Sequence, residues 1–366
     1  MKQRIINTMV CLALTTTMHA QGVLTLTFGS VINNMRIYND TLFVATCASL
    51  QTYDLGSGEQ SEGDALCVVL YDYLRNGTRS MSIYADGVTY QQHPLNSDFI
   101  YRGERHPDKN LMGYTLSRSA DFGQTWWTTG LEKRQFPGRP HIAFNPMNAD
   151  EMYIFGTDEF VNCICPWVIH TTDGMQTLHS VDLQMEEDRE MTVFMQMAFS
   201  PTEPGLLLMA TTSGMARSTD GGVTWHYTTD DGRLFTDVCF DDLQSGVAYA
   251  LEDTPQPLCD PQMHYALLRS TDSGQTWTQL TELAVPMFHT GTTTGLRGLQ
   301  CYKGRLFCWA DDHVYIVDVQ PERAMMPTGV GALRLSSGRE AFDLLGRRAS
   351  AVKGIVVGNG RKYFVK

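Results

Sequence analysis

The chain has 366 residues, of which 43% are hydrophobic and 19% charged, so it can bury a large core and is not expected to be disordered. Its formal net charge of -12 argues against a nucleic-acid partner, because phosphate binding needs clustered lysine and arginine, and no such cluster precedes the last twenty residues. Length and composition together fit one large domain with a small appendage.

Residues 1–20 are typical of a signal peptide. A basic end and a short, mostly apolar run precede an expected cleavage after Ala20. The run is too short for a membrane anchor, and we expect no transmembrane segment once the signal is removed. The mature chain is therefore expected to reach the periplasm, and from there the outer membrane, the cell surface or the medium.

Removal of the signal leaves an even number of cysteines, which permits disulfides in an exported chain without fixing their pairing. They are Cys47, Cys67, Cys163, Cys165, Cys239, Cys259, Cys301 and Cys308. The closely spaced Cys163 and Cys165 lack a histidine or a second cysteine pair at the spacing of metal ligands. We therefore expect no metal and no cofactor, and we interpret Cys239 and Cys301 as buried packing residues.

One motif recurs four times. Three copies follow the pattern Ser-x-Asp-x-Gly-x-Thr-Trp, and a degenerate copy has Met175 in place of the glycine and Leu178 in place of the tryptophan. The copies begin at positions spaced 47 to 52 residues apart, namely Ser119, Thr171, Ser218 and Ser270. A period near fifty, with strand-like segments between the copies, is typical of the blades of a β-propeller.

Each copy is expected to form a hairpin turn. The aspartate can accept main-chain N–H groups, the glycine supplies a positive φ that Met175 is expected to adopt poorly, and the tryptophan packs beneath the turn. We interpret these residues as structural, with no catalytic role. They are Asp121, Gly123, Trp126, Asp173, Asp220, Gly222, Trp225, Asp272, Gly274 and Trp277.

Two apolar strands around a Pro/Asn/Asp/Gly turn precede the last three copies, and residues 35–46 and 300–310 fit the same template without a motif. The alternating run Val23–Phe28 is expected to complete the last blade, which would remove two open sheet edges. The predicted fold is therefore all-β: a six-bladed propeller over residues 22–320 with a small C-terminal β appendage. The alternative of seven blades requires a shorter repeat than the observed spacing.

Residues 321–336 have the composition of a linker, and residues 337–366 form a separate segment. In it, Phe342-Asp-Leu-Leu-Gly-Arg347 and Lys353-Gly-Ile355 precede two strand-like runs around Asn359-Gly360, a strong hairpin signal. The segment resembles the end of the C-terminal sorting domain of type IX secretion in Bacteroidetes, although Val356 stands where those domains have an aromatic. The resemblance implies that the type IX machinery recognises residues 340–366. The alternative is a small capping sheet on the propeller.

The repeated motif resembles the Asp-box (BNR) repeat. Residues 30–320 are similar to Asp-box propellers, which include sialidases, xyloglucan-degrading glycosidases, sortilin-type receptors and photosystem assembly factors. The resemblance implies the fold but not an activity. In sialidases the first arginine of the site lies in an Arg-Ile-Pro sequence, whereas this chain has Arg36-Ile-Tyr38 and no Glu/Tyr constellation. The xyloglucan-degrading enzymes use two propellers. We expect a non-catalytic propeller that binds a glycan or an extracellular protein, with a glycosidase of the sialidase or endoglucanase kind as the alternative.

A ligand is expected on the face away from the motif turns, where the loops between second and third strands and between blades emerge. Arg139 and Arg297 each lie five residues before an inner-strand aromatic and are expected together at the channel mouth, where guanidiniums suit an anionic ligand. The alternative is that nearby acidic residues neutralise them. The candidate ligand-binding residues are Arg139, Arg297, Arg233, Arg105, Asp158 and Asp253.

Overall fold

The first unit of the chain is a β-propeller. The computed structural model divides the chain into two compact units, Met1–Ala324 and Met325–Lys366, which are considered separately. The described residues contain strands and no helix, as the sequence predicts. They are residues 17–19, 23–29, 32–38, 40–46, 50–62, 89–93, 98–105, 113–121, 124–128, 136–138, 140–157, 166–187, 189, 192–255, 260, 262–286, 296–319, 342–343, 354–358 and 361–365.

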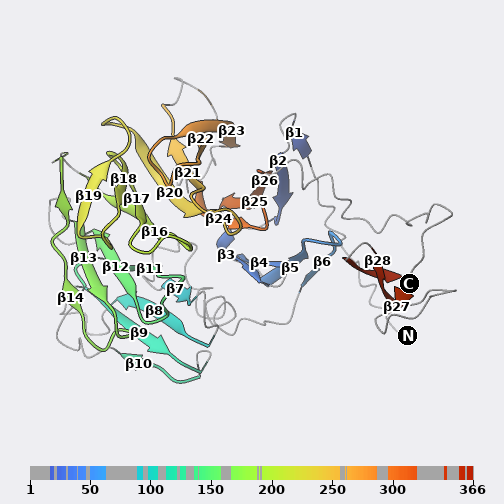
Figure 1. Ribbon diagram of the computed structural model, residues 1–366, viewed down its shortest axis with the longest axis horizontal. Helices are drawn as coiled ribbons and strands as arrows, with labels where there is room; N and C mark the ends of the chain where they lie inside the picture. The colour runs from blue at the N-terminus through green and yellow to red at the C-terminus, as the bar shows by residue number, and fades with distance from the viewer. Residues whose placement is uncertain are drawn as a thin grey trace, which may run out of the picture. The chain divides into compact units, whose positions relative to one another are not determined.

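Six sheets follow one another in chain order through the first unit, and we call them blades 1 to 6 (Figure 1). Blade 1 consists of β3 (Ile32–Tyr38), β4 (Thr41–Thr46), β5 (Leu50–Asp54) and β6 (Gln60–Glu62). Blade 2 consists of β7 (Thr89–Gln92), β8 (Ile100–Arg105), β9 (Tyr114–Ser119) and β10 (Trp127–Thr128). Blade 3 consists of β11 (His141–Phe144), β12 (Met152–Thr157), β13 (Pro166–Thr171) and β14 (His179–Ser180).

The remaining blades repeat this up-and-down order. Blade 4 consists of β16 (Phe194–Phe199), β17 (Leu207–Thr211), β18 (Gly214–Ser218) and β19 (Thr224–Tyr227), with β15 (Gln184–Met185) added at its outer edge. Blade 5 consists of β20 (Leu234–Phe240), β21 (Ala248–Asp253), β22 (Gln262–Ser270) and β23 (Thr278–Pro286). Blade 6 contains β24 (Arg297–Tyr302), β25 (Arg305–Ala310) and β26 (His313–Asp318). Residues 63–88 lie outside the described residues, so the number of blades in the whole ring stays a prediction.

The N-terminal strand β2 (Val23–Thr27) completes blade 6. It pairs antiparallel with β26, from Val23 opposite Val317 to Thr27 opposite His313, as its alternating sequence predicted. A further short strand, β1 (Thr17–His19), pairs with β2 at the edge of this sheet and falls within the predicted signal peptide. Without β1, blade 6 still has four strands, so the expected cleavage is compatible with a complete blade.

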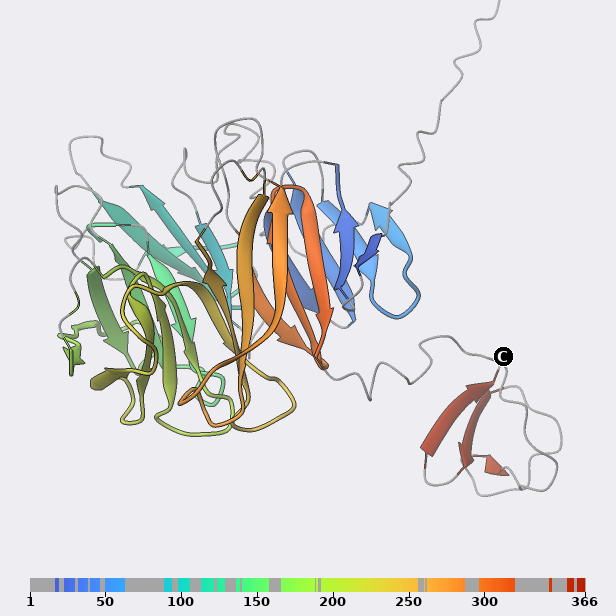
Figure 2. The same ribbon diagram turned by 90° about the horizontal axis from the view of Figure 1, so that it is seen from above.

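The apolar core lies between the blades. Within the described residues, five clusters of buried side chains join blades 2 and 3, 3 and 4, 4 and 5, 5 and 6, and 6 and 1. Blades 3 to 6 therefore bury both of their faces, which explains why all five residues of β17 are buried and why its sequence, Leu-Leu-Met-Ala-Thr, shows no polar alternation. The strands of neighbouring blades are seen beside one another in Figure 2.

The second unit contains a small antiparallel sheet of β27 (Phe342–Asp343), β28 (Gly354–Gly358) and β29 (Arg361–Val365). Gly358 pairs with Arg361 across Asn359-Gly360, which is the hairpin that this dipeptide predicts. Across the described residues of both units, the structure has no helix long and apolar enough to cross a membrane.

Candidate functional site

The two faces of the propeller carry different ends of the strands. In three blades the motif turn donates a main-chain N–H to a carbonyl in the turn between the first and second strands, over 2.8–2.9 Å: Gly174 to Asp150, Gly221 to Gly205 and Ser273 to Gly246. Both kinds of turn therefore lie on one face, the turn face. The innermost strands begin at the opposite face, the loop face.

Each motif turn is held by its aspartate. Asp220 accepts hydrogen bonds from Ser218 Oγ at 2.8 Å and from the N–H and hydroxyl of Thr224 at 3.0 and 2.5 Å. Burial disfavours the charged form of Asp220, but these hydrogen bonds outweigh it and lower its pKa to about 2. The aspartates of the other copies, Asp121, Asp173 and Asp272, make the equivalent contacts. Their pKa values are also lowered to about 2. The threonine hydroxyl is the main cause at Asp121 and Asp173, whereas at Asp272 the hydrogen bonds outweigh burial, which acts in the opposite direction.

The degenerate turn corrects one expectation. Met175 has a φ of 72°, close to the 91° of Gly222 and the 82° of Gly274, so a methionine does occupy the left-handed conformation. Its side chain is fully buried in the cluster between blades 2 and 3. Burial of a methionine side chain contributes about 1.5–3 kcal/mol, which offsets the roughly 1–2 kcal/mol cost of a positive φ.

The motif turns of blades 3, 4 and 5 also contact the preceding blade. Arg118 of blade 2 donates to the carbonyl oxygen of Gly174 in the blade 3 turn at 2.8 Å. Arg217 of blade 4 makes the same contact with Ser273 in the blade 5 turn, also at 2.8 Å. Tyr153 of blade 3 donates its hydroxyl to Gly221 in the blade 4 turn. These contacts hold three of the motif turns against the preceding blade.

Arg233, one of the predicted ligand-binding residues, has an internal partner. It lies at the start of blade 5 on the loop face, and its Nε and Nη2 donate to the two carboxylate oxygens of Glu252, both at 2.6 Å. The hydrogen bonds that Arg233 donates to this carboxylate are the main cause that raises the pKa of Arg233. The two charges compensate one another, so this arginine is positioned by the protein before any ligand arrives.

Asp253 ends β21 of blade 5 opposite Tyr265, and Arg297 begins β24 of blade 6, so both lie at the loop-face ends of their strands. Burial raises the pKa of Tyr265 to about 12, and the nearby charges of Asp253 and Asp311 act in the same direction, whereas Arg297 and the N–H of Leu296 oppose them. Tyr265 is only 1% exposed. The structure therefore gathers charged side chains from both blades on the loop face, around a buried tyrosine that the sequence did not single out.

Several predicted residues cannot be placed in this cluster. Arg139, Asp158 and the motif glycine Gly123 lie outside the described residues, and Arg105 is the last residue of β8 with its side chain outside them. The expected pairing of Arg139 with Arg297 at the channel mouth therefore stays a prediction.

Asp237 is a buried carboxylate on the innermost strand of blade 5. It accepts hydrogen bonds from the N–H groups of Leu299 of blade 6 at 2.9 Å and of Val238 at 2.8 Å. Burial raises its pKa to about 6, against the hydrogen bonds from these groups, from Gly298 and from the Gln196 side chain of blade 4. Asp237 thus connects three blades. An aspartate inside an otherwise apolar inner strand was the signal that could have revealed it.

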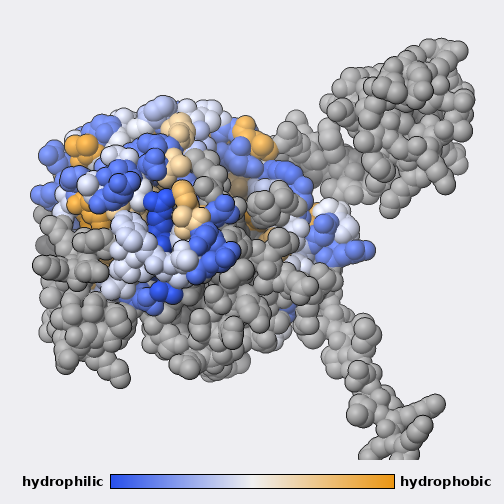
Figure 3. Space-filling model, turned by 90° about the horizontal axis from the view of Figure 1, so that it is seen from below, coloured by the Kyte–Doolittle hydropathy of each residue, from blue (hydrophilic) through white to orange (hydrophobic). Residues whose placement is uncertain are grey.

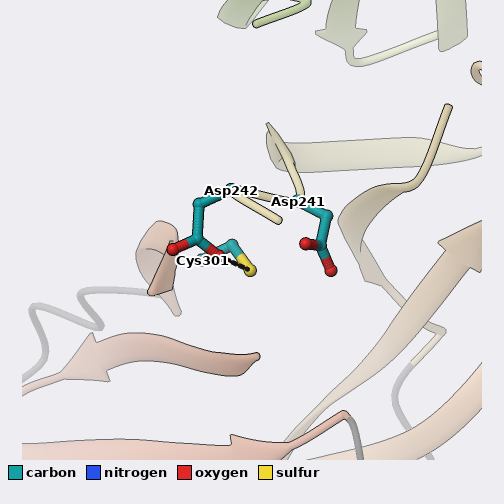
Figure 4. Close-up of side chains that lie close together, drawn as sticks. All are labelled: Asp241, Asp242 and Cys301. Atoms are coloured by element: carbon teal, nitrogen blue, oxygen red, sulfur yellow. Dashed lines mark hydrogen bonds between the residues drawn. The ribbon is translucent and has the colours of Figure 1, made fainter. Parts of the chain in front are cut away.

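Asp241, Asp242 and Cys301 lie close together on the turn face (Figure 4). The oxygens of Asp241 accept hydrogen bonds from the N–H groups of Leu243 and Gln244, at 2.8 and 2.9 Å, and from the Tyr249 hydroxyl at 2.9 Å. These contacts stabilise a turn. Nothing else among the described contacts of this group indicates a bound metal.

The described surface is mostly hydrophilic in the view of Figure 3, with apolar residues in separate spots. The large exposed apolar side chains of the described residues come from blades 2 to 5. They are Trp127, Met147, Val223, Leu243 and Leu280. The charged cluster on the loop face, rather than an apolar surface, is therefore the candidate site.

The fold defines this chain as a β-propeller. No protein-family model matches the sequence, and a search of curated proteins found no match. An ancestral GH74 enzyme is 14% identical over 81% of this chain and 36% of its own length, with a TM-score of 0.44. YCF48 bound to a D1 peptide is 12% identical over 83% and 99%, with a TM-score of 0.39. An inactive virginiamycin B lyase from Staphylococcus aureus is 10% identical over 80% and 98%, with a TM-score of 0.46. These likenesses concern the fold only.

Proposed function

We propose that this chain is an exported, non-catalytic propeller that binds a glycan or a protein through its loop face, at the cell surface or outside the cell. The observation that carries the proposal is the position of three charged residues, Arg297, Asp253 and Asp311, at the loop-face ends of strands in blades 5 and 6. The aspartates of the motif turns, in contrast, are committed to holding those turns. The loop face is therefore the better candidate for recognition of a polar ligand.

We propose that the propeller is not catalytic because two of its carboxylates already have partners within the protein. Glycoside hydrolysis by paired carboxylates needs two that face one another across a pocket, roughly 5–10 Å apart. Glu252 is held in the bidentate pair with Arg233, and Asp237 is buried against main-chain N–H groups. Neither is disposed to act as an acid or a nucleophile on a sugar.

Export is proposed from the two ends of the sequence. Residues 1–20 have the pattern of a signal peptide, and residues 340–366 resemble a type IX sorting segment of Bacteroidetes. Deletion of residues 340–366 should leave the protein in the periplasm. Arrival of the shortened protein at the cell surface would mean that the segment has only a structural role.

A glycan array, run in parallel with turnover of chromogenic glycosides, tests the binding role. We expect a ligand whose affinity falls about tenfold or more in Arg297→Ala, since a charge-assisted hydrogen bond contributes roughly 1.5–3 kcal/mol. Val223→Thr, an exposed position on the turn face, is the matched control and should bind normally. Turnover of a glycoside would support the glycosidase alternative. If Arg297→Ala binds the ligand as tightly as the wild type, the loop face is not the binding site that we propose.

A further inference from the structure

Two thiols lie near one another at the border of blades 5 and 6. Cys239 is on β20 and Cys301 on β24, the innermost strands of these blades, and both are free thiols in the structure. Both pack against the apolar cluster that joins the two blades. They are 62 positions apart in the sequence, so only the closing of blade 6 onto blade 5 brings them together.

Two hydrogen bonds between the strands fix the register of the two cysteines. On the N-terminal side of the cysteines, the N–H of Leu299 donates to Asp237 at 2.9 Å. On their C-terminal side, the N–H of Lys303 donates to Asp242 at 2.7 Å. Cys239 follows Asp237 by two residues and Cys301 follows Leu299 by two, so the cysteines occupy the same level of two strands that run in the same direction.

The two residues also influence one another electrostatically. The main-chain N–H of Cys301 acts to lower the pKa of the Cys239 thiol, whereas burial, the largest effect, raises it. The thiol of Cys301 points toward Asp242, with its Sγ 3.4 Å from the carboxylate (Figure 4). Rotation of this side chain away from Asp242 would sacrifice one weak hydrogen bond, while Asp242 would keep the N–H of Lys303.

We propose that Cys239 and Cys301 form a disulfide that joins blades 5 and 6 when the chain folds in an oxidising environment. One S–S bond forms and two S–H bonds break. The two protons and two electrons pass to a disulfide oxidant, such as glutathione disulfide or the active-site disulfide of a thiol oxidase, which becomes two thiols. A bridge across this border would link the two blades covalently next to the point where the ring closes.

The environment of the thiols sets the order of events. Burial raises the pKa of both Cys239 and Cys301, so little thiolate is present once blade 6 has docked. Because the thiolate is the attacking species, exchange with the oxidant is fast in the unfolded chain and slow in the folded, reduced protein. The bond is therefore expected to form during folding.

Refolding of the full, reduced chain with glutathione disulfide tests the proposal independently of where the cell sends the protein. Trypsin digestion without reductant should give residues 298–303, which contain Cys301, linked to residues 234–269. The second peptide also contains Cys259. Cys259→Ser should therefore keep the cross-link and Cys239→Ser should lose it.

Cys308 supplies a matched control, because it is a third thiol in the same cluster but lies on β25. Cys308→Ser should keep the cross-link. Reduction of the wild-type protein should lower Tm by on the order of 5–10 °C, and reduction of Cys239→Ser should change it far less. If the tryptic disulfide map of the refolded wild-type protein shows Cys301 free, or bonded to another cysteine, the proposal is wrong. This outcome does not require the variants to fold.

Discussion

The guanidinium of Arg217, on the third strand of blade 4, donates to the main-chain oxygen of Ser273 in the motif turn of blade 5, over 2.8 Å. Arg118 makes the equivalent contact between blades 2 and 3. In blades 2 and 4, the arginine directly before the motif serine thus attaches its blade to the motif turn of the next blade. Neighbouring blades are joined by a repeated polar contact as well as by apolar packing.

Removal of this contact should destabilise the propeller. Arg217→Ala is expected to lower the free energy of unfolding by about 1.5–3 kcal/mol, since a carbonyl loses its charged hydrogen-bond donor. Arg269→Ala is the matched control, because Arg269 occupies the same position in blade 5 and its Nε has no hydrogen-bond partner among the described residues. Chemical denaturation measures both. An equal loss in the two variants would contradict a specific role for the contact with Ser273.

The motif aspartates predict a sensitivity to acid. Their folded pKa values of about 2 lie below the ordinary aspartate value of 3.8, so the stability they contribute is present above about pH 4 and is lost as the pH falls toward 2. Asp220→Asn should therefore lose stability at neutral pH and show a shallower fall of Tm between pH 4 and pH 2. Thermal melts across this range measure the slope. Parallel curves for the variant and the wild type would contradict the assignment.

Asp237 predicts the opposite dependence on pH. Its folded pKa of about 6 lies above the ordinary aspartate value of 3.8, so burial of the charged form costs stability above pH 6, and this cost disappears as the pH falls toward 4. The shift corresponds to about 3 kcal/mol at most. Tm should therefore rise between pH 7.5 and pH 5 in the wild type.

Asp237→Asn should flatten this rise. His264 titrates in the same direction, because the hydrogen bonds that its ring donates to Asp260 and Glu282 raise its pKa, and stability from these contacts is lost as the pH rises. His264→Gln therefore separates the two contributions and should leave the Asp237 dependence in place. A pH slope that His264→Gln abolishes would assign the effect to the histidine.

Met175 allows the cost of its backbone conformation to be measured. Both Met175→Gly and Met175→Ala should destabilise the protein by roughly 2–4 kcal/mol, because the buried side chain is lost. Glycine tolerates the φ of 72°, whereas alanine does not, so the glycine variant should be more stable than the alanine variant by about 1 kcal/mol. Denaturation of the three proteins gives the order, and a more stable alanine variant would mean that the backbone at this turn is relaxed.

The sequence by itself determined the features that arise within one blade. The motif from Ser218 to Trp225 carries its own hydrogen-bond donors and acceptors within eight residues, so its turn could be predicted without knowledge of the rest of the chain. The same is true of the hairpin at Asn359-Gly360 and of the alternating strand that begins at Val23. The spacing of the motifs then indicated a ring of blades.

Only the tertiary structure decided which side chains meet between strands and between blades. The partner of Arg233, the burial of Asp237 and the approach of Cys239 to Cys301 depend on contacts between segments far apart in the chain. The pattern of one strand does not record which residue of the next blade will face it. A hydrogen bond within a turn is set by local backbone geometry, whereas a contact across blades is set by the packing of the whole ring, and for that reason the candidate site emerged from the fold.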